Sequence, residues 1–352
     1  MDQASILQKV RQHEPLMRYR EGELFFPMKV DNYVAECSLH EWVGGNDHVM
    51  RVAPGELNVS NLFQWLSNVN FMVYADQKTY VNVLPTVSAQ LTSFSIIPET
   101  IEGLRKISAI VTGGKLPKII TETAHAKYGG ITENLPTYYY RVITKEESGE
   151  KYDVIQYWFF YAFNDWATTF GGVNDHEGDW EMMQLVFNDL EDEYPLYSVY
   201  AAHDGFFKRK WEFTEKDDSG NHPIAYVQGG SHAAFPARDL GTLRYLFKST
   251  VKNPFGLIRY LSEFVEAGGE LWAEGDIMIG QGGNHSWSEP VNLHGETWVP
   301  TYRGLWGTRY YVSRIGRRRK VPKSGGAPSG PMFDTDGFVR SAWETPNKWC
   351  EL

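Results

Sequence analysis

The segment NDHEGDWEMM at 174–183 holds the residues of this chain that are best suited to chemistry. If the residues after Gly178 form a strand, their side chains alternate, and Asp179 and Glu181 share a face with the apolar residues that follow. Burying an unpaired carboxylate costs several kcal/mol, so a cation, an arginine or a shared proton should compensate each one. His176 precedes Asp179 across the flexible Gly178 and can reach the same point.

A histidine and two carboxylates suit a divalent cation and leave coordination positions open for water or a ligand. Mg²⁺, Ca²⁺, Mn²⁺, Fe²⁺ and Zn²⁺ all accept such donors, and no thiolate favours a softer metal. The sequence therefore predicts a divalent-metal site at His176, Asp179 and Glu181, with Asp165 as a further ligand from the end of the preceding strand. The identity of the metal stays open.

Two more histidines follow predicted strands and are candidates for catalysis. His203 ends the run PLYSVYAAH, and His232 follows a Gly-Gly-Ser turn. If these strand ends meet at one rim of a sheet, either histidine could act as a general acid or base beside a metal. The sequence leaves open whether they reach Asp179. The chain has no nucleophile elbow, phosphate-binding loop or dinucleotide fingerprint that would indicate another chemistry.

The elements that must position these residues have the pattern of a sheet. Apolar runs typical of buried strands occur at 155–163, 179–187, 195–203, 222–230, 271–279 and 297–313. Turn residues separate the runs, so an antiparallel arrangement is expected.

Helical patterns flank the predicted strands. Residues 1–13 predict a short amphipathic helix, and 98–112 predict a second one that ends at a glycine. A helical insertion is expected at 239–267, within which Asn253 is a plausible N-cap. Residues 114–150 have a polar, loop-like pattern.

Together these patterns predict a mainly β fold: an antiparallel β-sandwich with a helical N-terminal segment and a helical insertion. Residues 151–352 would form the sandwich core, and 1–150 would pack on it or extend it. The aromatic content, with 12 Trp, 20 Tyr and 19 Phe, favours sheets, and 352 residues suffice to bury a full core.

Composition limits the compartment and the partners. The formal net charge of −10 argues against nucleic-acid binding, which needs a basic surface. Cys37 and Cys350 cannot form a disulfide framework, and no signal peptide or membrane span is recognisable, so a cytoplasmic location is expected. A basic run could bring the chain to anionic lipids as a peripheral contact through Arg317, Arg318, Arg319 and Lys320. The oligomeric state stays open.

An ordered set of motifs resembles the vacuolar protein sorting-associated protein 62 family. The motifs are YWFFYAFND at 157–165, DHEGDWE at 175–181, AAHDG at 201–205, HPIAYVQGGSHAAFP at 222–236, YRGLWG at 302–307 and GAPSGP at 326–331. The resemblance covers about half of the chain, and a weaker one lies at 14–39. It implies membership of a family with a trafficking-derived name and implies no particular activity.

The core His-x-x-Asp-Trp-Glu is also similar to the heptapeptide of the necrosis- and ethylene-inducing peptide-like cytolysins. In that family the His, Asp and Glu at this spacing bind a divalent cation in a β-sandwich, which implies the same role for His176, Asp179 and Glu181. The chain departs from the pattern at Gly178, where the cytolysins have histidine. Their upstream Asp ligand has no clear counterpart, since Thr168 stands at about that spacing and Asp165 is only nearby.

Three functions remain open from the sequence. The first is a divalent-metal-dependent binding protein that recognises a small molecule, an anionic lipid head group or a sugar head group through the His/Asp/Glu site. The second is a metal-dependent hydrolase of a phosphoester, ester or glycoside, with His203 or His232 as general acid or base. The third is a structural or trafficking module in which the motif ties strands together.

Overall fold

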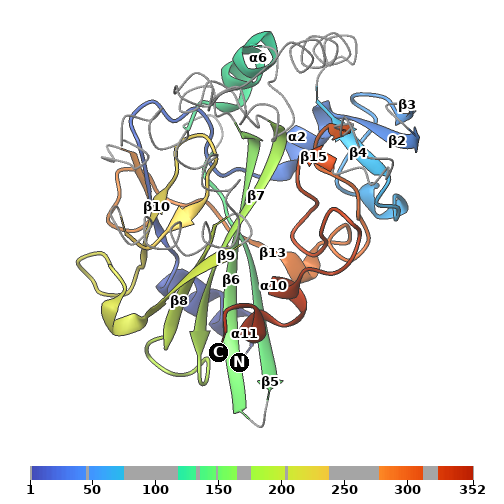
Figure 1. The fold of residues 1–352 in the computed structure, drawn as a ribbon. Coiled ribbons are helices and arrows are strands. Elements are labelled where there is room, and N and C mark those ends of the chain that lie inside the picture. Colours follow the sequence, from blue (N-terminus) through green and yellow to red (C-terminus); the bar gives the residue numbers. More distant parts are fainter. Residues whose placement is uncertain are drawn as a thin grey trace, which may run out of the picture.

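The computed structural model describes residues 2–44, 47–74, 118–131, 135–147, 150–164, 176–202, 205–237, 277–311 and 324–351. Within these ranges the chain is mainly β, as expected, and its helices are few and short (Figure 1). Two sheets and the side chains between them position the candidate site.

The largest sheet has six strands in the order β13-β5-β6-β7-β8-β9. Its strands are β13 (Val291–Asn292), β5 (Tyr139–Glu147), β6 (Glu150–Asn164), β7 (His176–Phe187), β8 (Tyr197–Ala202) and β9 (Gly205–Lys210). From β5 to β9 all neighbours are antiparallel, whereas β13 runs parallel to β5. The central pair β6 and β7 stays in register from Asp153 opposite Phe187 to Asn164 opposite His176.

The aromatic run of β6 explains why this strand lies at the centre. Its residues alternate between two buried faces: Tyr157 and Tyr161 pack into one apolar cluster, and Trp158 and Phe160 pack into another. Full burial of a large apolar side chain contributes about 1.5–3 kcal/mol, so both faces of the strand stabilise the sheet. A strand that is apolar on both sides must be covered on both sides, and the rest of the chain supplies the covers.

A second sheet covers the face that holds Tyr157 and Tyr161, in the order β11-β10-β1-β12. Its strands are β1 (Leu16–Tyr19), β10 (Ile224–Val227), β11 (Ala234–Phe235) and β12 (Ile277–Ile279). Side chains of both sheets share one core, which makes the pair a sandwich. Strand β1 runs parallel to β10 and antiparallel to β12, so the sandwich is not purely antiparallel.

The opposite face of the large sheet packs on α2 (Val30–Glu36), a small sheet and two buried tryptophans, Trp298 and Trp306. The small sheet has the order β3-β2-β4. Its strands are β2 (Ser38–Gly44), β3 (Asp47–Val52) and β4 (Asn70–Val73). Trp306 contacts Phe160 and Trp180 at ring centroid distances of 5.3 Å each, so the 302–307 segment lies against the β6–β7 pair.

The remaining elements lie around these layers. They are α1 (Gln3–Gln12), η1 (Leu62–Gln64), α6 (Lys118–Tyr128), η2 (Trp211–Phe213), η3 (Leu293–Gly295), β14 (Arg309–Tyr311), β15 (Ser324–Gly326), α10 (Ser341–Glu344) and α11 (Pro346–Trp349). The N-terminal helix is capped by Asp2, whose Oδ1 accepts a hydrogen bond from the Ser5 N–H at 2.8 Å.

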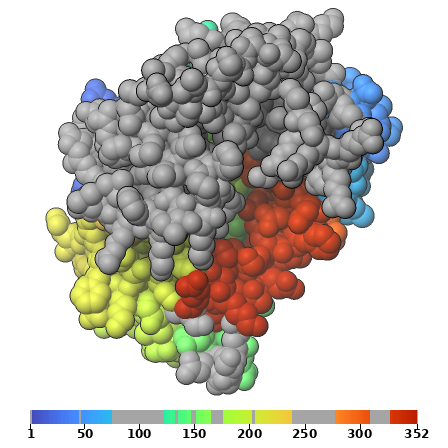
Figure 2. All heavy atoms as spheres, viewed as in Figure 1, coloured from blue at the N-terminus to red at the C-terminus, as the bar shows by residue number. Residues whose placement is uncertain are grey.

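The C-terminal segment docks on the large sheet through a buried polar network. Arg141 donates to the Trp343 carbonyl at 2.9 Å, and Gln156 donates to the Ala342 carbonyl at 2.7 Å. The Arg141 guanidinium also lies 3.7 Å from the Trp343 ring centroid. Figure 2 shows this segment, in red, on the outside of the molecule beside residues 205–237.

Several expectations from the sequence need correction or lie outside the described residues. The region 114–150 is not a loop, because α6 and β5 lie within it. Of the expected strand at 297–313 the structure has β14, whereas 297–308 forms turns around Trp298 and Trp306. The expected helix at 98–112 and the insertion at 239–267 lie outside the described residues.

Strand pairing crosses the boundary expected at residue 151, since β5 pairs with β6 and β1 pairs with β10. The division of the chain into two regions therefore stays a prediction. None of the helices in the described ranges has the length and apolar character needed to span a bilayer.

Candidate functional site

The predicted alternation places Asp179 and Glu181 on the sandwich side of β7. In the ladder, Asp179 lies opposite Tyr161 and Glu181 opposite Phe159, both of which face the core between the two sheets. Trp180 and Met182 point to the other face. On this face of β7 the two carboxylates are therefore followed by the apolar side chains of Met183, Leu185 and Phe187.

At the start of β7 the backbone of Gly178 lies close to the backbone of Trp306. Gly178 has φ +57°, and a Cβ at this position would clash with the backbone of Trp306. Its neighbour Glu177 accepts hydrogen bonds from the Thr308 N–H at 2.9 Å and from the Tyr74 N–H at 3.0 Å. Glu177 thus ties two distant segments to the strand and serves the fold.

His232 lies between two carboxylates. Its Nδ1 is 3.0 Å from Asp179 Oδ2, and its Nε2 is 3.5 Å from Glu23 Oε1. The ring is fully buried and stacks on Tyr161 at 3.8 Å between centroids and 2° between planes. Its backbone has φ 58°, a left-handed conformation that costs a non-glycine residue on the order of 1 kcal/mol. The contacts of the ring fix this conformation.

Both carboxylates that flank His232 have further partners. Asp179 Oδ2 accepts from Asn164 Nδ2 at 3.3 Å. Glu23 accepts from the Gly230 N–H at 3.0 Å and from the Leu24 N–H at 2.9 Å. The turn that carries His232 is thereby joined to the segment that follows β1.

The charges of this group follow from its contacts. Burial alone would lower the pKa of His232, but the hydrogen bonds and charges of Asp179 and Glu23 outweigh it and raise the pKa to about 9. Burial opposes the ionisation of Asp179 and Glu23, yet contact with His232 holds both pKa values below normal. At neutral pH the group is therefore two carboxylates around one imidazolium.

Glu181 differs from its neighbours. Burial and the negative charge of Asp179 raise its pKa well above the ordinary value, and the guanidinium of Arg340 opposes the shift only in part. Arg340 itself donates to the backbone carbonyls of Phe333 at 2.8 Å and Ser329 at 3.1 Å. Glu181 is the residue of this face whose charge is least compensated.

His176 is oriented by the backbone of its own strand. Its Nδ1 lies 3.1 Å from the Gly178 carbonyl oxygen and 3.3 Å from that of Glu177. Carbonyl oxygens only accept, so Nδ1 carries the proton, and Nε2 of the neutral ring is left as the lone-pair nitrogen. Burial lowers the pKa of His176, which keeps the ring neutral.

The structure brings four of the predicted site residues to one end of the β6–β7 pair: His176, Asp179, Glu181 and His232. Within the described ranges, no three His, Cys, Asp or Glu side chains are arranged to hold a metal ion together. Asp165, His203, Arg317, Arg318, Arg319 and Lys320 lie outside these ranges. The metal ligands and the catalytic roles of His203 and His232 therefore stay predictions.

Sequence reasoning missed three residues of this group: Glu23, Tyr161 and Arg340. Tyr161 was assigned to the core, and its stacking on His232 has no sequence signal. Glu23 and Arg340 come from segments far from β7 in sequence. Glu23 and Arg340 come close to Asp179 only when the chain is folded.

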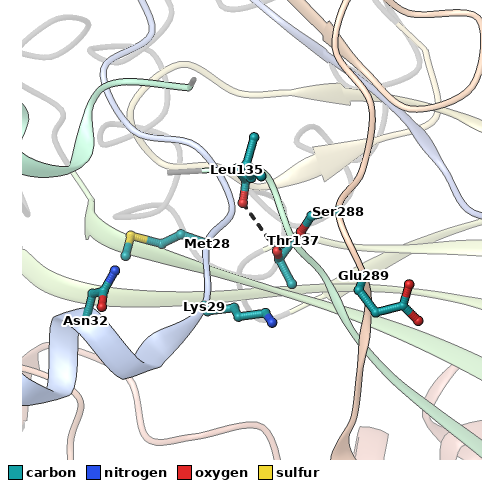
Figure 3. Close-up of a pocket in the computed structure, with 7 residues that line it drawn as sticks. All are labelled: Met28, Lys29, Asn32, Leu135, Thr137, Ser288 and Glu289. Carbon is teal, nitrogen blue, oxygen red and sulfur yellow. Dashed lines mark hydrogen bonds between the residues drawn. The ribbon is translucent and has the colours of Figure 1, made fainter. Parts of the chain in front are cut away.

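A separate surface pocket of about 330 Å³ lies away from these residues (Figure 3). Its lining comprises Met28, Lys29, Asn32, Leu135, Thr137, Ser288 and Glu289. The hydroxyls of Thr137 and Ser288 hydrogen-bond to each other at its wall. None of the predicted site residues that the structure describes lines this pocket.

Comparisons with known proteins give a distant similarity. No family model matches the chain, and no curated protein matches it. Among solved structures, NLPPya in complex with glucosamine matches with a TM-score of 0.25 and 16% identity, covering 32% of this chain and 48% of that chain. NLPPya in complex with mannosamine has a TM-score of 0.25, 15% identity and the same coverage. The non-toxic HaNLP3 protein has a TM-score of 0.22 and 18% identity, covering 30% and 46%.

The chain thus spans less than half the length of the NLP structures that it matches. This similarity to necrosis- and ethylene-inducing peptide-like proteins is in line with the distant resemblance expected from the sequence. A similarity of this size does not assign the chain to a family. The resemblance to the vacuolar protein sorting-associated protein 62 family stays a prediction.

Proposed function

We propose that this chain is a divalent-cation-dependent binding protein that recognises an anionic lipid or sugar head group at the acidic end of β7. The observation that carries the proposal is a pair of carboxylates on the sandwich face of β7, of which Asp179 is buried and Glu181 is partly buried. A third carboxylate, Glu23, adjoins the pair, and one imidazolium lies between it and Asp179. The three carboxylates outnumber the imidazolium, and the guanidinium of Arg340 offsets the raised pKa of Glu181 only in part. Burial makes the remaining negative charge costly.

The charge balance supports a cation at Glu181. Asp179, Glu23 and protonated His232 together carry one net negative charge. Glu181 lies beside that charge with a pKa raised by burial and by Asp179. A divalent cation that bound both Asp179 and Glu181 would remove the repulsion between them.

The available side chains offer ligand atoms of the right type for such an ion, but too few of them to fill its coordination shell. Asp179 uses Oδ2 for His232 and Asn164, which leaves Oδ1 for an ion. Glu181 would offer its carboxylate as the second protein ligand. Since no three of the described acidic, His or Cys side chains converge on one point, Asp165 or an oxygen of the bound head group would complete the shell. A phosphate oxygen or sugar hydroxyl suits that open position.

Binding is favoured over catalysis by the state of His232. Both of its ring nitrogens face carboxylates, and the ring has no exposed surface. A general acid or base must reach the proton that it transfers. In this position His232 orients Asp179 instead.

The proposal is tested by co-sedimentation of the full chain with vesicles that contain phosphatidylserine, and by binding to an immobilised glycan panel. Both are measured with Ca²⁺ or Mn²⁺ and again with EDTA. We expect cation-dependent binding to one of the two surfaces, weakened at least tenfold by Asp179→Asn and by Glu181→Gln. The matched control is Glu191→Gln, which alters an exposed carboxylate on the loop after β7. Binding that is insensitive to EDTA, or equal in Asp179→Asn, would contradict the proposal.

A further inference from the structure

The small sheet carries two histidines side by side. His40 of β2 lies opposite Met50 of β3, and Trp42 lies opposite His48, so His40 and His48 are diagonal neighbours on one face. Their Nδ1 atoms are 3.0 Å apart. The sheet lies at the edge of the molecule (Figure 1), and His48 retains accessible surface.

Ser38 fixes the tautomer of His40. The Ser38 hydroxyl donates its one proton to the Val73 carbonyl at 3.2 Å. With that proton on Val73, its oxygen accepts from His40 Nε2–H, which lies 2.8 Å away. The Nδ1 of His40 then carries a lone pair on the side of His48.

The separation of the two nitrogens fits a shared metal ion. Two imidazoles at Zn–N or Cu–N distances of about 2.0–2.1 Å, with an angle of about 90–109° at the metal, place their nitrogens about 2.9–3.4 Å apart. The observed 3.0 Å lies in this range. It also fits an N–H···N hydrogen bond between the rings, which is the alternative that the experiment must exclude.

The surroundings hold both rings in place and keep them neutral. Phe71 packs on His40 at 5.7 Å and on His48 at 5.3 Å between ring centroids. Burial lowers the pKa of His40 to about 4 and also lowers that of His48, so neither ring is protonated at neutral pH. The charge of Asp47 acts on His48 and would favour a cation there.

We propose that His40 and His48 form a two-histidine site for a late first-row transition-metal ion, Zn²⁺ or Cu²⁺, with Ser38 as the outer partner that orients His40. Imidazole nitrogens prefer these metals, whereas the carboxylates of β7 suit harder cations. The site therefore shares no residues with the proposed function.

The test is calorimetric titration of Zn²⁺ and of Cu²⁺ into the EDTA-stripped full chain that carries Asp179→Asn and Glu181→Gln, so that the β7 site does not contribute. We expect one ion per chain, with an affinity at least tenfold weaker in His48→Ala. Because His48 is partly exposed, this variant should fold, and circular dichroism checks that it does. Ser38→Ala should weaken binding by about 10–100-fold, as the loss of an outer partner of a metal-bound histidine does.

His294→Ala, which removes an exposed histidine, is the matched control and should leave the affinity unchanged. Absence of Zn²⁺ and Cu²⁺ binding, or equal affinity in His48→Ala, would overturn the proposal and leave a hydrogen-bonded histidine pair. Because the assay is run without the β7 carboxylates, its failure is distinguishable from failure of the proposed function.

Discussion

His232 connects three parts of the chain that are far apart in sequence: β7, the turn after β10 and the segment after β1. Asp179 and Glu23 hold its two nitrogens, and Tyr161 covers its face. The sequence indicated His232 as a neighbour of Asp179 only on the condition that strand ends meet. Glu23 could not be predicted, because its role depends on a sheet that pairs β1 with β10 across some two hundred residues.

Replacing His232 should reveal the charge that it compensates. In His232→Ala two buried carboxylates lose their shared cation, and removal of one partner from a buried pair costs about 3–5 kcal/mol. We expect urea unfolding to show a loss of that size in the free energy of unfolding. Adding Asp179→Asn and Glu23→Gln to this variant should restore part of the loss, since no unpaired charge then remains. A loss below about 1 kcal/mol in His232→Ala would contradict the charge assignment.

His13 should make the fold sensitive to mild acid. It is fully buried, with its ring nitrogens 3.0 Å and 3.1 Å from the carbonyl oxygens of Asn221 and Glu193. These contacts favour the protonated ring, but burial outweighs them and lowers the pKa to about 4. The pKa of His13 in the folded protein lies below its pKa of about 6.5 in the unfolded chain. The neutral ring therefore contributes fully to the free energy of unfolding above pH 6.5, and this contribution is lost as the pH falls towards 4. Between pH 7 and pH 5 this loss is about 2 kcal/mol.

The measurement is the free energy of unfolding against pH for the parent chain and for His13→Asn. Acidic groups and other histidines titrate in both proteins, so the difference between the two curves isolates His13. We expect the parent to lose more stability than the variant over this interval. Parallel curves would show that His13 carries no proton linkage.

At the scale of elements, strands with strong apolar patterns were the easiest to predict. The runs at 155–163 and 179–187 lie within β6 and β7, and the faces of β7 follow the expected alternation. The run 297–313 contains β14, but its first part was wrong as a strand, because Trp298 and Trp306 are buried from turns. Apolar residues occur in buried turns as well as in buried strands, so the apolar pattern alone could not distinguish a turn from a strand here.

Gly178 is a position in β7 that has no room for a side chain. In Gly178→Ala the new Cβ meets the Trp306 backbone, and the left-handed φ adds strain. We expect a loss of about 2 kcal/mol or more in unfolding free energy, together with weaker cation binding at Asp179. Gly220→Ala is the matched control: its φ of +75° is similar, yet nothing lies within 4 Å of the new Cβ. Equal losses in both variants would rule out the contact with Trp306 as the cause.

At the scale of the whole molecule, the mainly β class and the sandwich could be predicted from composition and strand patterns. The sheet order could not be, because the parallel pairing of β1 with β10 and of β13 with β5 joins segments without any local signal. The same pairings argue that the core at 151–352 depends on the first part of the chain. Both sheets of the sandwich contain strands from before residue 150.

Expression of residues 151–352 alone tests this dependence. Without β1 and β5, the edges of β10 and β6 would be unpaired and the apolar faces beneath them uncovered. We expect the fragment to be insoluble, or to lack a cooperative unfolding transition, whereas the full chain unfolds cooperatively. A soluble fragment with a sharp thermal transition would show that the boundary at 151 separates independent units.

Cation binding by Asp179 and Glu181 can be observed in a crystal of the full chain soaked in Mn²⁺. Anomalous scattering locates the ion without assumptions about its ligands. We expect an anomalous peak within coordination distance of both Asp179 and Glu181, absent from crystals of Asp179→Asn. A site that stays empty at saturating Mn²⁺, with Asp179 still paired to His232 and Glu181 free of metal, would contradict it.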